Sequence, residues 1–161
     1  MFGAAAHVPY NSGMKNGNDH LSLPTGVKTA LKKRLAQPGH FHNHLGIVLE
    51  DARTGWARLS MDITPELINV LGIVHGGAIF SLVDTAMGTA LIGLLAEEEG
   101  MATVEAKINY VSPVREGTVT AEAEVKHRGR RTAVIESRVT DGRGRSVALA
   151  LGTYLILEPG S

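Results

Sequence analysis

The sequence contains no cysteine and carries no net charge, because 16 basic residues balance 16 acidic ones. Without cysteine, disulfide bonds, thiolate nucleophiles and cysteine metal ligands are all excluded. The balanced charge removes the broad electropositive surface that nonspecific nucleic-acid binding requires, so we expect no nucleic-acid partner. The first seven residues also lack the basic start and sustained apolar run of a secretory signal. Together these absences favour a cytoplasmic protein.

Long apolar segments are also scarce. Residues 78–96 approach the length of a membrane span, but they carry a central charge at Asp84. A carboxylate at that depth costs roughly 2.5 to 3.5 kcal/mol in a bilayer. The glycines, serine and threonines of this segment suit a packed protein interior better, so we expect no membrane span. The segment instead predicts a buried helix, because its apolar residues recur at helical spacing: Ile79, Leu82, Val83, Ala86, Ala90 and Leu94.

At 161 residues, the chain is long enough for one substantial core and too short for two ordinary domains. Residues 1–22 are rich in Gly, Asn, Ser and His and predict a flexible N-terminal tail. Residues 23–158 then form a single domain. A first helix is predicted over residues 25–37, because Pro38 and Gly39 would stop it there.

Six strand-like segments flank the apolar helix, and residues 65–74 lead into it as a short helix or loop. The strands are predicted at residues 45–51, 55–62, 101–110, 117–126, 132–140 and 146–157. Short turns between successive strands make the sheet mostly antiparallel. A helix that is apolar nearly all round cannot leave much of its circumference wet. We therefore predict an α+β fold, a curved antiparallel sheet wrapped around one long central helix.

The start of that helix is the most informative part of the chain. Gly76 and Gly77 follow His75, and backbone N–H groups in the first turn of a helix have no intrahelical partner. Without side chains, these glycines let an oxyanion or phosphate approach the free N–H groups. Asp84, on an otherwise apolar helix, must be either desolvated or directed into a cleft. It is therefore a candidate for chemistry, although a structural hydrogen bond to a backbone amide would also explain it.

Several spaced motifs together resemble the hotdog-fold acyl-CoA thioesterases of the PaaI-like branch, which is linked to phenylacetic acid degradation. The resemblance covers residues 45–157. The motifs that carry it are residues 69–77 (NVLGIVHGG), 80–86 (FSLVDTA), 108–113 (INYVSP) and 129–133 (GRRTA). It implies hydrolysis of an acyl-CoA thioester, with coenzyme A as part of the substrate and product and no separate cofactor.

The resemblance also implies roles for individual residues. Asp84 would act as general base or nucleophile, and the Gly76 N–H would polarise the thioester carbonyl. Asn69 and His75 would assist, although Asn69 could equally be a local turn residue. Thr103 begins the strand after the helix, where some relatives use a hydroxyl as a partner of the carboxylate.

A basic cluster forms a second candidate site. Arg128, Arg130 and Arg131 surround Gly129, and guanidinium groups bind phosphates bidentately. By resemblance, this cluster would hold the nucleotide phosphates of coenzyme A, with Gly77 also on the substrate-binding side. A solvated turn remains the alternative, and the sequence does not choose among the three arginines.

Helix geometry makes an assembly prediction. Asp84 lies eight residues beyond Gly76, or roughly 12 Å along the helix axis at 1.5 Å per residue. One chain therefore cannot direct both groups at one carbonyl carbon. We expect a homodimer as the active unit, with Asn69 and Gly76 of one subunit facing Asp84 of the other, as the resemblance also implies. A homotetramer, as a dimer of such dimers, is also expected, although helix geometry does not bear on it.

Alternative functions remain open. A hotdog hydratase or dehydratase, or a non-catalytic acyl-CoA-binding regulator, could share the fold. His40, His42 and His44 alternate, but no further ligand accompanies them at a familiar spacing, so no metal is expected. The acyl group is open between aryl and medium-chain groups, with four apolar residues as candidate pocket lining: Leu71, Ile73, Phe80 and Leu91.

Overall fold

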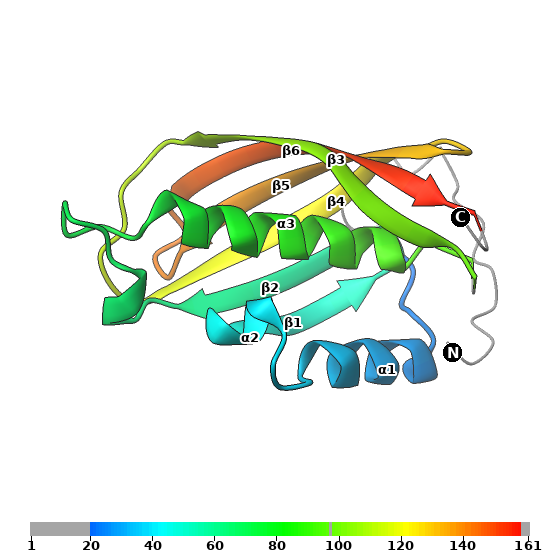
Figure 1. Cartoon of the computed structure of the whole chain (residues 1–161), viewed down its shortest axis with the longest axis horizontal. Helices are drawn as coiled ribbons and strands as arrows, with labels where there is room; N and C mark the ends of the chain where they lie inside the picture. Colours follow the sequence, from blue (N-terminus) through cyan, green and yellow to red (C-terminus); the bar gives the residue numbers. More distant parts are fainter. Residues whose placement is uncertain (1–19, 97, 159–161) are drawn as a thin grey trace.

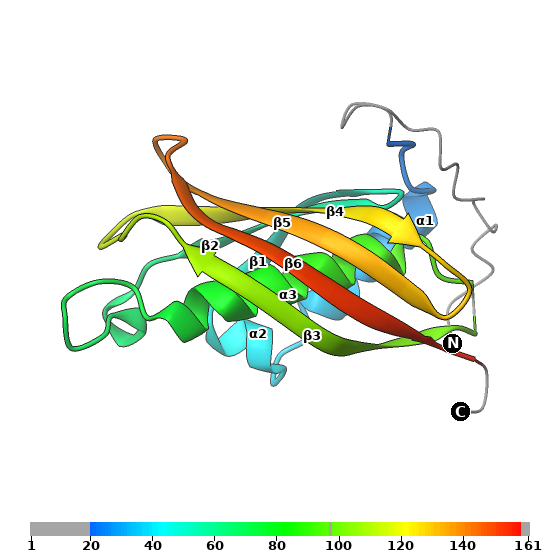
Figure 2. The same cartoon turned by 90° about the horizontal axis from the view of Figure 1, so that it is seen from above.

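The computed structural model describes residues 20–96 and 98–158. A curved, six-stranded antiparallel sheet in the order β1-β2-β4-β5-β6-β3 wraps around the long helix α3 (Figures 1 and 2). This arrangement confirms the predicted fold class. The elements in chain order are α1 (Thr25–Leu35), α2 (Phe41–His44), β1 (Ile47–Arg53), β2 (Trp56–Asp62), the 3-10 helix η1 (Pro65–Leu67), α3 (Gly76–Ile92), β3 (Gly100–Tyr110), β4 (Thr118–Arg128), β5 (Thr132–Asp141) and β6 (Ser146–Leu157).

Helix α3 is the centre of the core. Its buried side chains include Leu82, Met87 and Leu91, and they contact the inward faces of β2, β4 and β5. Alternate residues along the strands, such as Val119, Ala121 and the other inward positions of β4, complete this core. The helix therefore packs with one face against the sheet, and its first turn lies at the end of the sheet where β2 and β3 finish (Figure 1).

The helix ends earlier than the apolar run does. Residues up to Ala96 read as helical in sequence, but α3 stops at Ile92 and Gly93 caps it. A Cβ at Gly93 would lie 3.0 Å from the carbonyl oxygen of Arg53, so the β1–β2 hairpin presses directly on this turn. Leu94 then turns back and packs beneath Gly55 of the same hairpin. Burial of Leu94 outside the helix therefore explains why its apolar spacing continued past the true end.

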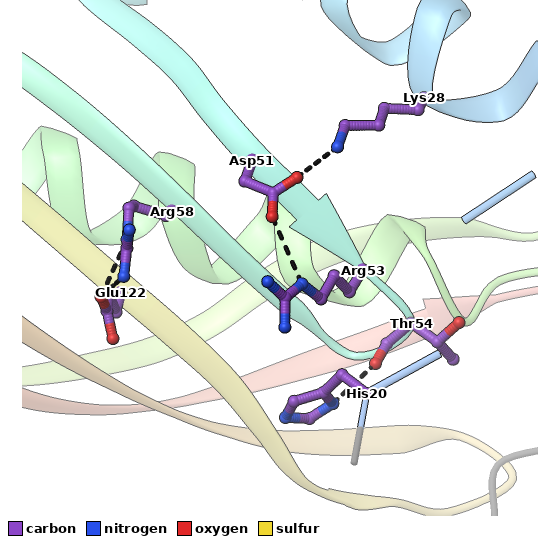
Figure 3. Close-up of polar contacts among 7 residues, drawn as sticks. All are labelled: His20, Lys28, Asp51, Arg53, Thr54, Arg58 and Glu122. Carbon is purple, nitrogen blue, oxygen red and sulfur yellow. Dashed lines mark hydrogen bonds and ion pairs between the residues drawn. The ribbon is translucent and has the colours of Figure 1, made fainter. Parts of the chain in front are cut away.

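The start of the described chain is attached to the same hairpin. His20 Nδ1 lies 2.8 Å from the carbonyl oxygen of Thr54 (Figure 3). Ser22 forms an isolated antiparallel β-bridge with Arg53. Lys28 on α1 pairs with Asp51 on β1. Most of the predicted N-terminal tail, residues 1–19, lies outside the described residues, and its last three residues run along the hairpin.

Strand β3 forms one edge of the sheet, and β1 forms the other. Within the described residues, β3 pairs only with β6, so its outer edge has no strand partner. Val104 in the middle of this edge strand is 61% exposed, and Tyr110 and Val111 at its end are also exposed. An exposed edge strand that carries apolar side chains such as Val104 is a natural place for another chain to pair.

No helix within the described part of the chain is long and apolar enough to cross a membrane.

Candidate active site

Asp84 lies half-buried in the middle of α3, where its side chain faces β3 and β6. Two hydroxyl groups converge on one oxygen of the carboxylate. Thr103 Oγ1 on β3 donates to Asp84 Oδ1 at 3.1 Å, and Tyr154 OH on β6 donates to the same oxygen at 2.7 Å. Thr103 and Tyr154 are direct partners across the β3–β6 ladder, so their pairing places both hydroxyls at this point.

Tyr154 was missed by sequence reasoning. It is only 2% exposed, and its hydroxyl also lies 3.1 Å from the backbone oxygen of Asp84. Burial, and then the hydrogen bond and charge of Asp84, raise the pKa of Tyr154 far above its ordinary value. The signal was present in the alternation of residues 146–157, which turns Tyr154 inward with Ala150 and Gly152. A buried tyrosine hydroxyl requires a polar partner, and Asp84 is a candidate because it is the charged residue of the otherwise apolar helix segment.

The first turn of α3 forms the second part of the site. His75 caps the helix, because its Nδ1 accepts a hydrogen bond from Gly77 N at 2.9 Å. This imidazole, when neutral, therefore carries its proton on Nε2. The N–H of Gly77 is occupied by this contact, whereas the N–H of Gly76 has no acceptor among the described residues. Of the two glycines, Gly76 thus presents the available donor.

Tyr110 holds this first turn against the sheet edge. Its hydroxyl donates to the carbonyl oxygen of Gly76 at 2.8 Å. A Cβ at position 76 would lie 3.1 Å from Tyr110 Cζ, so the ring packs directly over the glycine. Glycine at position 76 therefore allows close approach of the tyrosine, in addition to leaving the backbone N–H accessible.

Asn69 forms the tight loop before the helix. Its Oδ1 accepts hydrogen bonds from Leu71 N at 2.9 Å and from Ile73 N at 3.4 Å. The turn alternative raised in the sequence analysis therefore accounts for the Asn69 oxygen. The side-chain amide nitrogen has no contact among the described residues and is the part of Asn69 that could reach a ligand.

The structure separates the site residues into two groups along α3. Thr103 and Tyr154 gather at Asp84, and His75, Tyr110 and the loop from Asn69 gather at Gly76. Asp84 is eight positions beyond Gly76 on one continuous helix, so roughly 12 Å of helix axis separates the two groups.

The arginine cluster also divides. Arg128 is largely buried and donates to both carboxylate oxygens of Glu99, at 2.9 and 2.7 Å. It thereby joins the β4–β5 turn to the segment that begins β3. Arg130 and Arg131 are exposed on that turn, where the N–H of Gly129 donates to the carbonyl oxygen of Thr132. The turn lies at the end of the sheet where β3 starts and β6 finishes (Figures 1 and 2).

The three alternating histidines lie in and beside the short helix α2. His42 Nε2 is 2.7 Å from the carbonyl oxygen of Leu35, and this contact joins α2 to α1. Within residues 20–96 and 98–158, no group of three His, Asp or Glu side chains is placed to hold a metal ion.

The candidate acyl-pocket residues occupy different environments. Leu91 is fully buried in the core and is not available to line an open pocket. Leu71 is exposed on the loop before α3, and Ile73 and Phe80 are half-buried near the same end of the helix. Three of the four therefore lie on the Gly76 side of the site.

Comparisons with known proteins identify the family and agree with the fold. The sequence pattern of the thioesterase superfamily matches residues 71–148. A presumed esterase of Saccharolobus solfataricus is 37% identical over 89% of this chain and 92% of its own. The acyl-coenzyme A thioesterase PaaI of Escherichia coli is 33% identical over 67% of this chain and 76% of its own. Its solved structure superposes with a TM-score of 0.74 over 81% of this chain and 94% of that one, at 25% identity. A conserved protein of Pseudomonas aeruginosa has a TM-score of 0.73 over 78% of this chain and 98% of that one, at 32% identity.

Proposed function

Since this chain belongs to the thioesterase superfamily and has the hotdog fold of its PaaI-like members, we propose that it hydrolyses acyl-CoA thioesters to a free acid and coenzyme A. The observation that carries the proposal is the half-buried Asp84, held by two hydroxyls on a helix whose first N–H group has no acceptor among the described residues. Coenzyme A enters only as part of the substrate and leaves as product, so no separate cofactor is required.

Asp84 supplies the reactive carboxylate. As general base it removes a proton from water, whose oxygen attacks the thioester carbonyl carbon. As nucleophile its own oxygen attacks instead, and water then hydrolyses the resulting anhydride. In both routes the C–S bond breaks and the departing thiolate of coenzyme A takes up a proton. The geometry of one chain is compatible with either route.

The first turn of α3 stabilises the negative charge that develops on the carbonyl oxygen. The Gly76 N–H points out of the positive end of the helix, and such preorganised donors are typically worth about 3 to 4 kcal/mol in the transition state. The His75 Nε2–H and the Asn69 side-chain amide lie in the same segment and can orient the thioester or the attacking water.

Two copies of the chain are needed to bring these groups together. The outer edge of β3 has no strand partner in the part of the chain that the structure describes, and the loop residues Val70 and Leu71 are exposed and apolar. Both observations support a second copy at this edge. If two β3 strands pair antiparallel about their middle, between Ala106 and Lys107, Tyr110 of one copy lies opposite Thr103 of the other. Tyr110 contacts Gly76 and Thr103 contacts Asp84, so the two halves of the site then meet. We propose this homodimer as the active unit, and a dimer of such dimers as the full assembly.

The exposed arginines supply binding energy for the nucleotide part of the substrate. Arg130 and Arg131 are the members of the cluster whose side chains face solvent, whereas Arg128 is engaged with Glu99. Guanidinium groups on a short turn can converge on the phosphates of coenzyme A. We therefore assign phosphate binding to Arg130 and Arg131.

Hydrolysis is favoured over hydration by the partners of Asp84. A hydratase would pair the carboxylate with a histidine acting on the β-carbon. Within the described residues of one chain, Asp84 contacts Thr103 and Tyr154, and in the shared site His75 would lie on the glycine turn, beside the carbonyl oxygen. The acyl group itself is open between aryl and medium-chain classes. A turnover panel of phenylacetyl-, hydroxyphenylacetyl-, benzoyl- and medium-chain acyl-CoA thioesters would identify it.

Complementation between two inactive variants tests the shared site. Asn69→Ala and Asp84→Asn damage opposite halves, so refolding them together in equal amounts makes about half of the dimers mixed, each with one intact site. Roughly a quarter of the parental activity should return. The control is each variant refolded alone, shown to be folded and inactive. If mass spectrometry detects mixed dimers and the mixture stays inactive, the shared-site arrangement is wrong.

A further inference from the structure

Tyr154 is the most deeply buried group in contact with the candidate carboxylate. We propose that Tyr154 is a positioning residue, which with Thr103 fixes Asp84 Oδ1 and so directs Oδ2 toward the reacting water or thioester. This inference rests on the proposed function, because it concerns the same carboxylate. It extends the proposed function by assigning different roles to the two carboxylate oxygens of Asp84.

The hydrogen-bond geometry separates those oxygens. Oδ1 accepts from both Tyr154 OH and Thr103 Oγ1, which uses its two lone-pair directions. No contact among the described residues involves Oδ2. Burial and the neighbouring charge of Asp84 raise the pKa of Tyr154, so its hydroxyl stays protonated and remains a donor at neutral pH. Oδ2 is therefore the oxygen left to accept a proton or to attack.

The tyrosine ring lies in a slot between two glycines. A Cβ at Gly152 on β6 would lie 3.3 Å from Tyr154 Cε2 and 2.8 Å from Met87 Sδ. A Cβ at Gly88 on α3 would lie 4.0 Å from Tyr154 Cε1. Because both neighbours lack side chains, the ring can pass between the helix and the sheet and reach back to Asp84, one helical turn earlier. Packing thus determines the position of the hydroxyl, which in turn restrains the carboxylate.

Tyr154→Phe tests the proposal, because it keeps the ring in its slot and removes only the donor. We expect kcat to fall roughly tenfold or more, since the carboxylate gains freedom to turn. KM should stay within about twofold of the parent, because the hydroxyl does not contact the substrate. In a crystal structure of the variant, the Asp84 carboxylate should adopt a second orientation.

Ser137→Ala is the matched control. Ser137 on β5 also carries a buried hydroxyl on the sheet, and its Oγ has no partner among the described residues. Its removal should leave kcat unchanged. A double-mutant cycle of Thr103→Val and Tyr154→Phe measures the coupling between the two losses in kcat. A general loss of packing would not produce such coupling. Because both hydroxyls act on one oxygen, the two losses in kcat should not multiply.

Each outcome bears on the proposal. An unchanged kcat with an unchanged Asp84 orientation would overturn it, as would losses that multiply in the cycle. Failure of Tyr154→Phe to fold would make the hydroxyl a requirement of the fold and would also overturn it. If the parent protein hydrolyses no thioester in the panel, the proposed function fails instead, and the crystallographic orientation of Asp84 still decides whether Tyr154 positions it.

Discussion

Two tyrosines attach α3 to neighbouring strands, one at the Asp84 end of the candidate site and one at the Gly76 end. The two ends differ in how they are formed. Tyr154 on β6 is 2% exposed and donates to the side chain of Asp84, whereas Tyr110 on β3 is 50% exposed and donates to the backbone of Gly76. Burial raises the pKa of both hydroxyls, and the charge of Asp84 adds to the effect only at Tyr154. One end is thus formed by core packing and the other by a loop and an edge strand.

This difference shows which part of the site one chain completes by itself. At Asp84, the helix, β3 and β6 supply the carboxylate and both of its hydroxyl partners. At Gly76, one chain supplies an N–H donor that has no acceptor in residues 20–96 and 98–158, and it lies among exposed apolar residues that include Val70 and Leu71. Exposed apolar surface beside an unpaired strand edge is what a second copy would cover.

The largest expected effect comes from the buried end. Asp84→Asn removes the ionisable group and keeps the side-chain volume, so kcat should fall by roughly 100- to 10,000-fold. Substrate binding and the melting temperature should change little. Steady-state kinetics and thermal unfolding check this. The control is Asp62→Asn, which makes the same carboxylate-to-carboxamide change at an exposed residue at the end of β2. A variant that keeps near-parental kcat would remove Asp84 from the chemistry.

The second prediction separates the two ends by breaking the proposed dimer. Val104→Lys places a charge on the edge of β3 and should yield folded monomers with a roughly tenfold or greater loss of activity. Light scattering gives the oligomeric state and kinetics give the activity. Val48→Lys is the matched control, because Val48 is 58% exposed on β1, the opposite edge strand. Fully active Val104→Lys monomers would show that one chain completes the Gly76 end alone.

The smallest effects are expected at the arginine turn, away from both ends. Arg130→Ala with Arg131→Ala should raise KM for acyl-CoA roughly several-fold and leave kcat unchanged, because phosphate contacts bind ground and transition states alike.

Arg128→Ala should instead lower the free energy of unfolding by about 1 to 2 kcal/mol, since it removes a partly buried ion pair with Glu99. Urea unfolding and kinetics distinguish the two effects. Equal KM values of the parent for acyl-CoA and the truncated pantetheine thioester would contradict the phosphate assignment.

Much of the fold could be predicted from the sequence because its periodic patterns are strong. All six strands, the first helix and the central helix lie close to their predicted positions. The end of α3 was misplaced because Leu94 keeps helical spacing yet packs against the hairpin outside the helix. Thr103 was placed beside Asp84 only by resemblance. The alternation of β6 indicates that Tyr154 is buried, but its contact with Asp84 joins positions 70 residues apart and leaves no local pattern.

The sequence by itself determined the local chemistry. A helix with two glycines at its start and one carboxylate in an apolar face can be identified from the sequence alone. Its apolar residues recur at helical spacing, and the glycines and the carboxylate lie within a few residues of one another. Only the tertiary structure decided which groups act on that carboxylate and which arginines face solvent. The β3–β6 register brings Thr103 and Tyr154 to the same oxygen, and the Glu99 contact buries Arg128 while its neighbours stay exposed. Such choices depend on packing between distant segments, whose positions are defined only when the sheet closes around the helix.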